Sequence, residues 1–185
     1  MTVYLMAGGG TAGHVNPLLA TADRLREIEP DAEVLVLGTA EGLEARLVPL
    51  RGYELVTVPK LPFPRRINAD AVRFPKRWGR SVALTRSIIR DRGVDAVIGF
   101  GGYASAPAYA AAHKEGVPLV IHEANARPGI ANRYGARLTR FVATVFASTR
   151  IRNGRLIGLP LRAEIEGLDR AAARAEALEF FGLSD

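Results

Sequence analysis

A glycine-rich run follows the first apolar segment of the chain and constrains its fold more than any other feature. Residues 5–17 read LMAGGGTAGHVNP, and glycines stand at positions 8, 9, 10 and 13. Glycine has no Cβ, so its backbone N–H groups can approach another segment or a bound anion closely. The run lies between a β-rich segment, residues 3–7, and a helical segment that begins near Asn16. The pattern predicts a strand, a tight loop and a helix.

The same order of elements recurs along the chain. Runs rich in Val, Ile and Leu occupy residues 33–38, 54–58, 95–102, 118–125 and 141–145, and helical patterns follow Gly42 and cover residues 106–116 and 129–138. Apolar strands alternating with helices predict an α/β fold with a doubly wound parallel sheet. In such a sheet the loops at residues 8–14, 99–105 and 122–125 should converge on one rim, where ligands bind. Residues 168–185 predict a final amphipathic helix with no strand after it.

Length and composition favour a single globular domain. The chain has 185 residues, of which 48% are hydrophobic and 24% charged, and it contains no cysteine. No apolar run approaches the roughly 18 residues of a membrane span. We expect no disulfide and no thiolate metal site, and the N-terminal MTVYLMAGGG has no basic region that would indicate a signal peptide. These features predict a cytoplasmic protein.

Positive charge is concentrated in one segment. The net charge is +6, but residues 60–92 alone carry ten basic side chains against Asp70 and Asp91, so the remainder of the chain is slightly acidic. The basic residues of this segment are Lys60, Arg65, Arg66, Arg73, Lys76, Arg77, Arg80, Arg86, Arg90 and Arg92. A local concentration of this kind indicates an interaction surface.

The glycine run matches the dinucleotide-binding pattern G-x-G-x-x-G at Gly8, Gly10 and Gly13. A dinucleotide site of this kind also needs an acidic residue at the tip of the second strand. Here Glu33 stands at the other end of that strand, and Glu41 lies beyond its tip. A P-loop is excluded because His14 follows where Lys and Ser or Thr are required. Two interpretations of the glycine run stay open: it forms a site for an anion such as a diphosphate, or it forms a tight turn without a ligand.

Other polar residues have plainer interpretations. Ser105 is expected to cap a helix that begins near Ala106, His113 is expected to be solvated, and His122 fits a structural role as well as a functional one. The sequence HEANA has Ala126 where a zinc-protease helix has its second histidine, and the chain has no D-x-D pair. We therefore expect no metal site.

Five motifs in one order carry a family resemblance: AGGGTAGHVNP, GTAEGLEARLVP, GFGGYASAP, HEANARPGIANR and GLPLR. Residues 1–165 resemble the N-terminal half of the MurG family of peptidoglycan N-acetylglucosaminyltransferases. The resemblance implies a Rossmann-like, acceptor-binding half of a two-domain GT-B glycosyltransferase. Residues 166–185 would then form a helical linker toward a C-terminal donor-binding domain, whose first strand is expected where this chain ends.

The family's reaction transfers GlcNAc from UDP-GlcNAc to the C4 hydroxyl of the MurNAc sugar in undecaprenyl-diphosphate-linked lipid I, forming lipid II with inversion. The resemblance implies these two substrates as partners, no cofactor or metal and no nucleic acid, and a chain that is inactive without the donor domain. Two alternatives from other classes are a nucleic-acid-binding domain that uses the basic segment, with only salt-sensitive binding, and a dinucleotide-dependent oxidoreductase.

The resemblance also assigns roles to residues. His14 is the candidate general base, with phosphate binding as its alternative role, and Glu123 supports the site. Donor contacts map onto Thr11, Ala12, Gly13, Asn125 and Arg162. The acceptor diphosphate is expected beside Gly10, His14, Gly101, Gly102 and Tyr103. Three positions depart from many family members: Ala12 replaces glycine, Ala124 replaces glutamine and Leu159 replaces asparagine, which changes the room and polar contacts available to the donor.

A lipid-linked acceptor implies work at an anionic membrane surface. We expect a membrane patch at Phe74, Lys76, Arg77, Trp78 and Arg80, within the basic segment, and peripheral attachment to the inner face of the plasma membrane. The apolar residues interleaved with the charges are expected to dip into the headgroup region; they are Leu61, Phe63, Phe74, Trp78, Val82 and Leu84. The alternative is a solvated basic loop whose aromatic residues belong to the core, and Ile88 and Ile89 are expected to pack inward.

Overall fold

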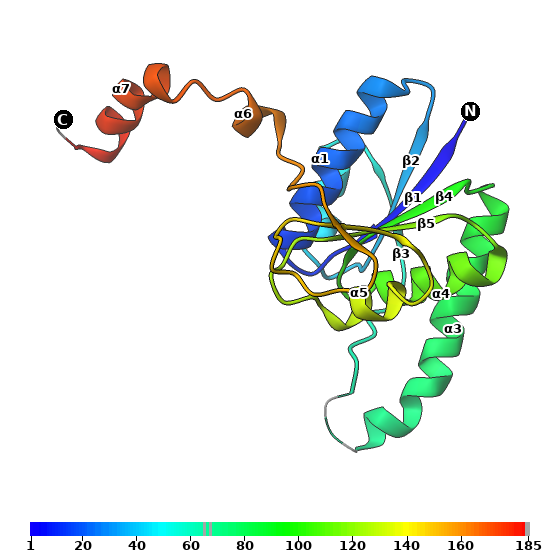
Figure 1. Ribbon diagram of the computed structural model, residues 1–185. Coiled ribbons are helices and arrows are strands. Elements are labelled where there is room, and N and C mark those ends of the chain that lie inside the picture. The colour runs from blue at the N-terminus through cyan, green and yellow to red at the C-terminus, as the bar shows by residue number, and fades with distance from the viewer. Residues whose placement is uncertain (65, 67, 184–185) are drawn as a thin grey trace.

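The computed structural model describes residues 1–64, 66 and 68–183. Its centre is a parallel sheet of seven strands in the order β3-β2-β1-β4-β5-β6-β7 (Figure 1). The strands are β1 (Val3–Gly8), β2 (Glu33–Gly38), β3 (Glu54–Thr57), β4 (Ala96–Gly101), β5 (Leu119–Glu123), β6 (Phe141–Thr144) and β7 (Gly154–Leu156). The chain builds outward from β1 to β3 and then returns to the other side of β1, so the strand order reverses between β1 and β4. This reversal is the switch point at which doubly wound sheets bind ligands.

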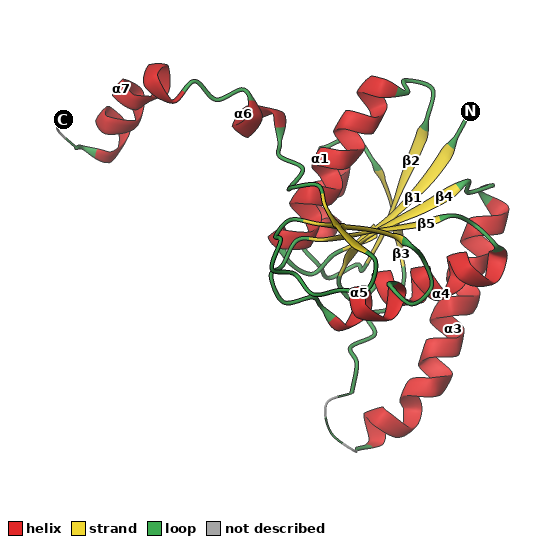
Figure 2. Cartoon of the chain, viewed as in Figure 1, coloured by secondary structure: helices red, strands yellow, loops and turns green. Residues whose placement is uncertain are grey.

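Both faces of the central strands β1, β2, β4 and β5 are buried, as their apolar sequences require. On β1, Leu5 and Ala7 pack into one core cluster with residues of α4 (Ser105–Glu115). Met6, between them, packs into a second cluster on the opposite face with Val15 and Leu18 of α1 (Ala12–Ile28). Successive strand residues point to opposite faces, so a nearly continuous apolar run is needed to serve both clusters. Figure 2 shows the two helical layers on either side of the strands.

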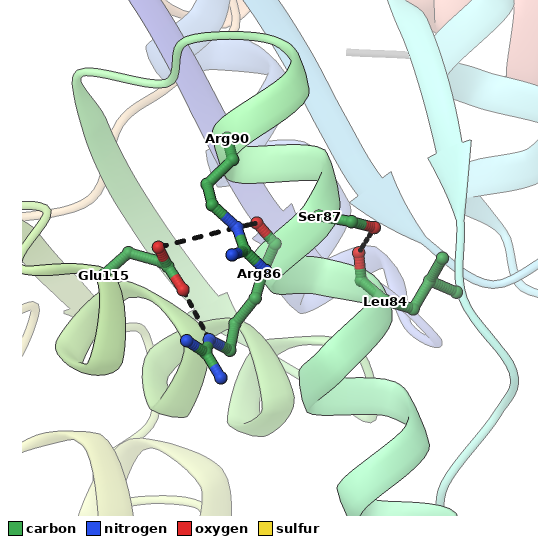
Figure 3. A network of polar contacts seen from close by, with 5 residues as sticks. All are labelled: Leu84, Arg86, Ser87, Arg90 and Glu115. Atoms are coloured by element: carbon green, nitrogen blue, oxygen red, sulfur yellow. Dashed lines mark hydrogen bonds and ion pairs between the residues drawn. The ribbon is translucent and has the colours of Figure 1, made fainter.

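Helices α2 (Glu44–Leu50), α3 (Ala69–Asp91) and α5 (Ile130–Gly135) complete these layers. Two further helices, α6 (Ala163–Glu166) and α7 (Arg170–Phe181), lie outside them. Helix α4 is buried from Ser105 to Ala112 because it lies beneath α3, and its small alanine side chains allow this close packing. Glu115 at the end of α4 forms ion pairs with Arg86 and Arg90 of α3 (Figure 3). These ion pairs fasten α3 to α4.

All six predicted strands and the parallel, doubly wound sheet are confirmed. The sequence analysis missed β7, a strand of three exposed residues with the sequence GRL, which has no apolar pattern to mark it. It also gave no helix for residues 69–91, where α3 is the longest helix among the described residues. Asn68 caps α3 by accepting a hydrogen bond from the backbone N–H of Ala71 at 3.1 Å.

Two predictions about polar residues have clear outcomes. The capping prediction for Ser105 is wrong: the residue is the first of α4. Its buried hydroxyl lies 2.9 Å from the carbonyl oxygen of Ala7 and 2.7 Å from that of Gly101, and its one hydrogen is shared between these two acceptors. It therefore ties the ends of β1 and β4 together instead of capping the helix. His113 is exposed on α4, as predicted.

The segment after β7 leaves the body of the domain. It crosses α1 and continues through α6 and α7 (Figure 1). Helix formation near the C-terminus was predicted, and Asp169 caps α7 by accepting from the N–H groups of Ala171 and Ala172. Neither α6 nor α7 contains a buried residue.

Candidate active site

Two glycine loops meet at the switch point, one after β1 and one after β4. A Cβ on Gly102 would lie 2.4 Å from the carbonyl oxygen of Gly9, which is closer than real Cβ contacts allow. Gly101 and Gly102 also have φ angles of +94° and +96°, a region that L side chains rarely adopt. Glycine is therefore required here both by the approach of the two loops and by the backbone conformation.

His14 stands where these loops meet. Its Nδ1 lies 2.9 Å from the carbonyl oxygen of Gly9 and 3.2 Å from the hydroxyl of Thr11. A carbonyl oxygen can only accept a hydrogen bond, so Nδ1 carries the hydrogen and donates it. In the neutral ring Nε2 is then the free base. This atom packs over Gly101, since a Cβ on that glycine would lie 3.0 Å from it.

The loops enclose a cavity of about 770 Å³. It collects seven of the residues predicted for the site, from the end of β5 and from the loops after β1 and β4: Gly10, Thr11, His14, Gly101, Gly102, Tyr103 and Glu123. Lys60 also lines the cavity and places its ammonium group 5.3 Å from the centre of the Tyr103 ring. The predicted convergence of the three loops is thus confirmed. Lys60 supplies a positive charge that the sequence analysis counted only as part of the basic segment.

Two helices begin at the rim of this cavity. Helix α1 starts directly after Thr11, whose side chain makes no capping hydrogen bond, and α4 starts after Ala104, whose side chain has no acceptor. The first N–H groups of a helix carry partial positive charge. The cavity therefore combines two helix N-termini with a lysine, an arrangement that suits a ligand carrying phosphate groups.

Glu123 at the end of β5 is buried and organises the loop that follows. One carboxylate oxygen accepts from the backbone N–H and the side-chain amide of Asn125, at 2.9 and 2.8 Å. The other accepts from the N–H of Gly129 at 2.9 Å and from the side-chain amide of Asn132 at 3.0 Å. Asn132 in turn accepts from the hydroxyl of Tyr109 at 2.7 Å. Both oxygens are occupied, so Glu123 shapes the cavity wall.

Glu44 is a second buried carboxylate, which the sequence analysis did not single out. It accepts hydrogen bonds from the N–H of Gly10 at 2.8 Å and from the N–H and hydroxyl of Thr39 at 2.9 and 2.8 Å. Burial acts to raise the pKa of Glu44, but these hydrogen bonds outweigh it and leave the pKa below its ordinary value. Glu44 is therefore ionised at neutral pH.

Three glycines lie directly against the Glu44 side chain. A Cβ on Gly9, Gly38 or Gly42 would come within 2.3, 2.5 or 2.1 Å of the Glu44 side chain. One signal in the sequence could have pointed to Glu44: its position inside the motif GTAEGLEARLVP, among nearby glycines. Its function as an anchor follows only from the fold, because its partners come from the β1 and β2 loops.

The residues predicted for donor binding do not gather in the cavity as a set. Thr11 lines it, whereas Ala12 and Gly13 are exposed in the first turn of α1 and Asn125 is exposed beside Glu123. Arg162 is exposed just before α6. Their part in donor binding stays a prediction.

The basic segment divides into two parts. Arg86 and Arg90 pair with Glu115, and Arg92 pairs with Glu33 and Glu54 at 2.5 and 2.6 Å. These arginines hold the domain together, so the segment is not one uniform surface. Among the described residues, no ion pair joins an acid to the exposed basic residues Arg73, Lys76, Arg77 and Arg80. Arg65, counted in the segment, lies outside the described residues.

The apolar residues of the segment also divide. Leu61 and Val82 are buried in the core, so their expected place on a membrane patch is wrong. Ile89 is buried and Ile88 packs against the same core, as predicted. Phe63, Phe74 and Trp78 are half-buried and stack on one another with ring centres about 6 Å apart, and Trp78 meets Tyr134 edge-on at 5.7 Å. We call these four residues the aromatic cluster.

The aromatic cluster lines a second cavity of about 500 Å³. Pro75, Ile130, Arg133 and Arg137 complete its wall. Phe63 and Ile130 line both cavities, so the apolar cavity adjoins the one that holds His14. The cavity that holds His14 and the apolar cavity thus share part of their wall.

His122 has a structural environment. It is buried, and its Nε2 donates to the carbonyl of Gly158 at 3.1 Å. Burial lowers the pKa of His122, against smaller opposing effects of that hydrogen bond and of Glu123. Within the described residues, no group of three or more His, Cys, Asp or Glu side chains is arranged to hold a metal ion.

The strand order, the switch point and the two facing glycine loops define a Rossmann-like domain, and its family and its structural neighbours make it one half of a GT-B glycosyltransferase. Comparison with protein families agrees with this class and narrows it. Residues 4–144 match the glycosyltransferase family 28 N-terminal domain. The chain belongs to this family.

Curated relatives extend the match to the whole chain. A protein of Leifsonia xyli subsp. xyli is 67% identical over 184 residues, and one of Clavibacter michiganensis subsp. michiganensis is 60% identical over 184 residues. Both are named UDP-N-acetylglucosamine–N-acetylmuramyl-(pentapeptide) pyrophosphoryl-undecaprenol N-acetylglucosamine transferase. The alignments cover 100% and 99% of this chain but 51% and 50% of those proteins. The chain thus spans about half the length of the curated relatives it matches.

Solved structures show the same relation. The crystal structure of Acinetobacter baumannii MurG superposes with a TM-score of 0.72 at 28% identity, covering 90% of this chain and 47% of that chain. A UDP-GlcNAc 2-epimerase from Neisseria meningitidis has a TM-score of 0.65 at 12% identity, covering 98% and 54%. The second likeness shows the fold alone.

Proposed function

We propose that this chain is the acceptor-binding half of an enzyme that transfers GlcNAc from UDP-GlcNAc to undecaprenyl-diphosphate-linked MurNAc, the lipid I of peptidoglycan synthesis. The observation that carries the proposal is His14, with Nε2 as its free base beside two glycine loops and two helix N-termini. Relatives that are 67% and 60% identical bear the name of this activity. Family membership favours this function over nucleic-acid binding and over a dinucleotide-dependent oxidoreductase.

The chemistry needs a base and fixed positive dipoles. The acceptor C4 hydroxyl would give its proton to Nε2 of His14 while its oxygen bonds to C1 of GlcNAc, and the bond from C1 to the UDP oxygen breaks. The hydrogen bond from Nδ1 to Gly9 stays in place throughout and stabilises the positive ring that results. The acceptor's own diphosphate would lie against the N-termini of α1 and α4 and the ammonium of Lys60. The proposal uses no metal and no cofactor.

The test is a transfer assay with the full-length protein that contains this chain, using UDP-GlcNAc and a lipid I analogue. We expect lipid II formation, and we expect His14→Ala to lower kcat by roughly 10²–10⁴, as for a lost general base. The matched control is His113→Ala, which removes an exposed histidine of α4 outside the cavity and should leave kcat unchanged. A normal kcat for His14→Ala at saturating substrates would show that His14 is not the base.

The acceptor's lipid chain calls for a surface that meets a membrane. None of the helices in the described part of the chain is long and apolar enough to cross one. We propose that the exposed basic residues Arg73, Lys76, Arg77 and Arg80, which form no ion pair within the described part of the chain, contact anionic headgroups on the inner face of the plasma membrane. The apolar cavity beside the aromatic cluster would face the lipid portion of the acceptor. Its shared wall with the His14 cavity supports this arrangement.

Liposome co-sedimentation tests the membrane proposal. The test variant has glutamate in place of Arg73, Lys76 and Arg80. Arg77 is kept, because it donates a hydrogen bond to the carbonyl of Lys60. At about 1 kcal/mol per basic residue near an anionic leaflet, losing three weakens binding by about 3 kcal/mol, or roughly 100-fold. Reversing the exposed residues Arg150, Arg152 and Arg155 changes the net charge equally and should have a much smaller effect. Equal losses in both triple variants, or equal binding to neutral vesicles, would refute the patch.

A further inference from the structure

The peptide between Gly9 and Gly10 joins two groups that the sequence keeps 30 residues apart, Glu44 and His14. Its N–H, on Gly10, donates to the Glu44 carboxylate at 2.8 Å. Its C=O, on Gly9, accepts from Nδ1 of His14 at 2.9 Å. The two ends of one peptide unit therefore contact a carboxylate on one side and the imidazole on the other.

We propose that Glu44 is a positioning residue for His14 and acts on it through the Gly9–Gly10 peptide. A negative charge at the N–H end polarises the peptide and makes its carbonyl oxygen a stronger acceptor. A stronger acceptor holds the hydrogen on Nδ1 and leaves Nε2 as the base. Carboxylates commonly do this by bonding the histidine directly, whereas here one peptide unit lies between them.

The structure around Glu44 supports a charged and immobile carboxylate. The side chain is 1% exposed, and its oxygens accept three hydrogen bonds from Gly10 and Thr39. Gly9, Gly38 and Gly42 surround it so closely that a methyl group on any of them would collide with the side chain. The three hydrogen bonds and the close glycines hold the carboxylate against the Gly10 N–H.

The geometry at His14 supports the other end of the relay. Thr11 adds a second oxygen 3.2 Å from Nδ1, and Gly101 lies against the Nε2 side of the ring. The ring is thus confined between the two glycine loops, with its hydrogen-bonded nitrogen directed at the peptide. When Nε2 takes a proton, the ring becomes positive, and the charge of Glu44 one peptide away stabilises it.

The tautomer of His14 can be measured without any enzymatic assay. The 185-residue chain has three histidines, so ring ¹⁵N labelling gives few signals, and His14→Gln assigns those of His14. In the unaltered chain above pH 8 we expect the tautomer with hydrogen on Nδ1. Finding hydrogen mainly on Nε2 would overturn the proposal without the need for a variant that folds.

The variant that tests the relay is Glu44→Gln, which retains the shape and removes the charge. We expect the Nδ1–H tautomer to lose population to the Nε2–H form. Thr39→Val removes one hydrogen bond to Glu44 but keeps its charge, and Asp23→Asn neutralises a carboxylate of α1 that binds Tyr53 and Arg51; both should keep the original tautomer. An unchanged tautomer in Glu44→Gln, or an equal change in Thr39→Val, would overturn the relay.

The kinetic consequence rests on the proposed function. In the full-length protein, Glu44→Gln should lower kcat about 10- to 100-fold, the scale known for groups that orient metal-bound histidines. The KM for UDP-GlcNAc should stay within about twofold, since the base acts on the acceptor. Absence of transfer in the unaltered protein would refute the proposed function and leave the tautomer result intact. A changed tautomer with an unchanged kcat would refute the catalytic part of the relay.

Discussion

Gly102→Ala tests the close approach of the two glycine loops. The new methyl group would lie 2.4 Å from the carbonyl oxygen of Gly9 and 3.1 Å from its carbonyl carbon. Both atoms belong to the backbone, so no side-chain rotation can relieve the collision. The alanine would also have to adopt a φ of +96°.

The expected loss of stability has two parts. A positive φ costs an alanine roughly 1–2 kcal/mol. Forcing an extra methyl group against fixed atoms costs about 1–3 kcal/mol more. The free energy of unfolding should therefore fall by about 2–5 kcal/mol, which is a large share of the roughly 5–15 kcal/mol that a domain possesses.

Gly116→Ala is the matched control. Gly116 ends α4 with a φ of +71°, but a Cβ there would meet nothing within 4 Å. It should lose only the part that comes from backbone conformation, about 1–2 kcal/mol. Urea unfolding of the two variants at pH 7.5 gives the comparison. Equal losses would refute the close approach of the loops, because the difference between the variants measures that contact alone.

Three further predictions concern groups near the site. Ser105→Ala leaves the buried carbonyls of Ala7 and Gly101 without their donor, so urea unfolding should show a loss of about 1–3 kcal/mol; no measurable loss would contradict this. Gly79→Ala, in the exposed interior of α3 with nothing near its Cβ, should raise stability by about 0.5–1 kcal/mol, and a decrease would count against the helix. Burial lowers the pKa of His122, so the unfolded ring gains a proton below about pH 6.5 while the folded ring does not. The free energy of unfolding should therefore fall as the pH drops below about 6.5, and His122→Gln should make this fall smaller. Identical pH profiles for the variant and the unaltered chain would contradict the prediction.

The central strands were predictable from sequence because both of their faces are buried. A strand that must be apolar on both sides is a nearly continuous run of apolar residues, as β1, β2, β4 and β5 are. The predicted run at β3 is also a strand, although none of its residues is buried. Strand β7 lacks that requirement, since its three residues are exposed. Helix α3 was missed because its basic residues suggested an interaction surface and hid the helical spacing of Val82, Thr85 and Ile89.

The candidate site was predictable in part. The loops that follow strands must meet at one rim, so Gly10, His14 and Gly101 were found from their positions after predicted strands. Glu44 was not found, because a carboxylate in a helix's first turn is ordinary in sequence and its partners lie in two other loops. Ser105 was misread since a serine at the start of a helix suggests a cap, whereas the fold turns its hydroxyl toward Ala7.

The proposed function assigns binding of the acceptor to this chain. Calorimetry of the 185-residue chain with two ligands tests this assignment: UDP-GlcNAc, and a short-chain prenyl-diphosphate MurNAc analogue. We expect binding of the acceptor analogue, weakened by Gly102→Ala and unchanged by Gly116→Ala. We also expect weak binding of UDP-GlcNAc and no transfer by the chain alone. Micromolar binding of UDP-GlcNAc together with no binding of the acceptor analogue would contradict the claim.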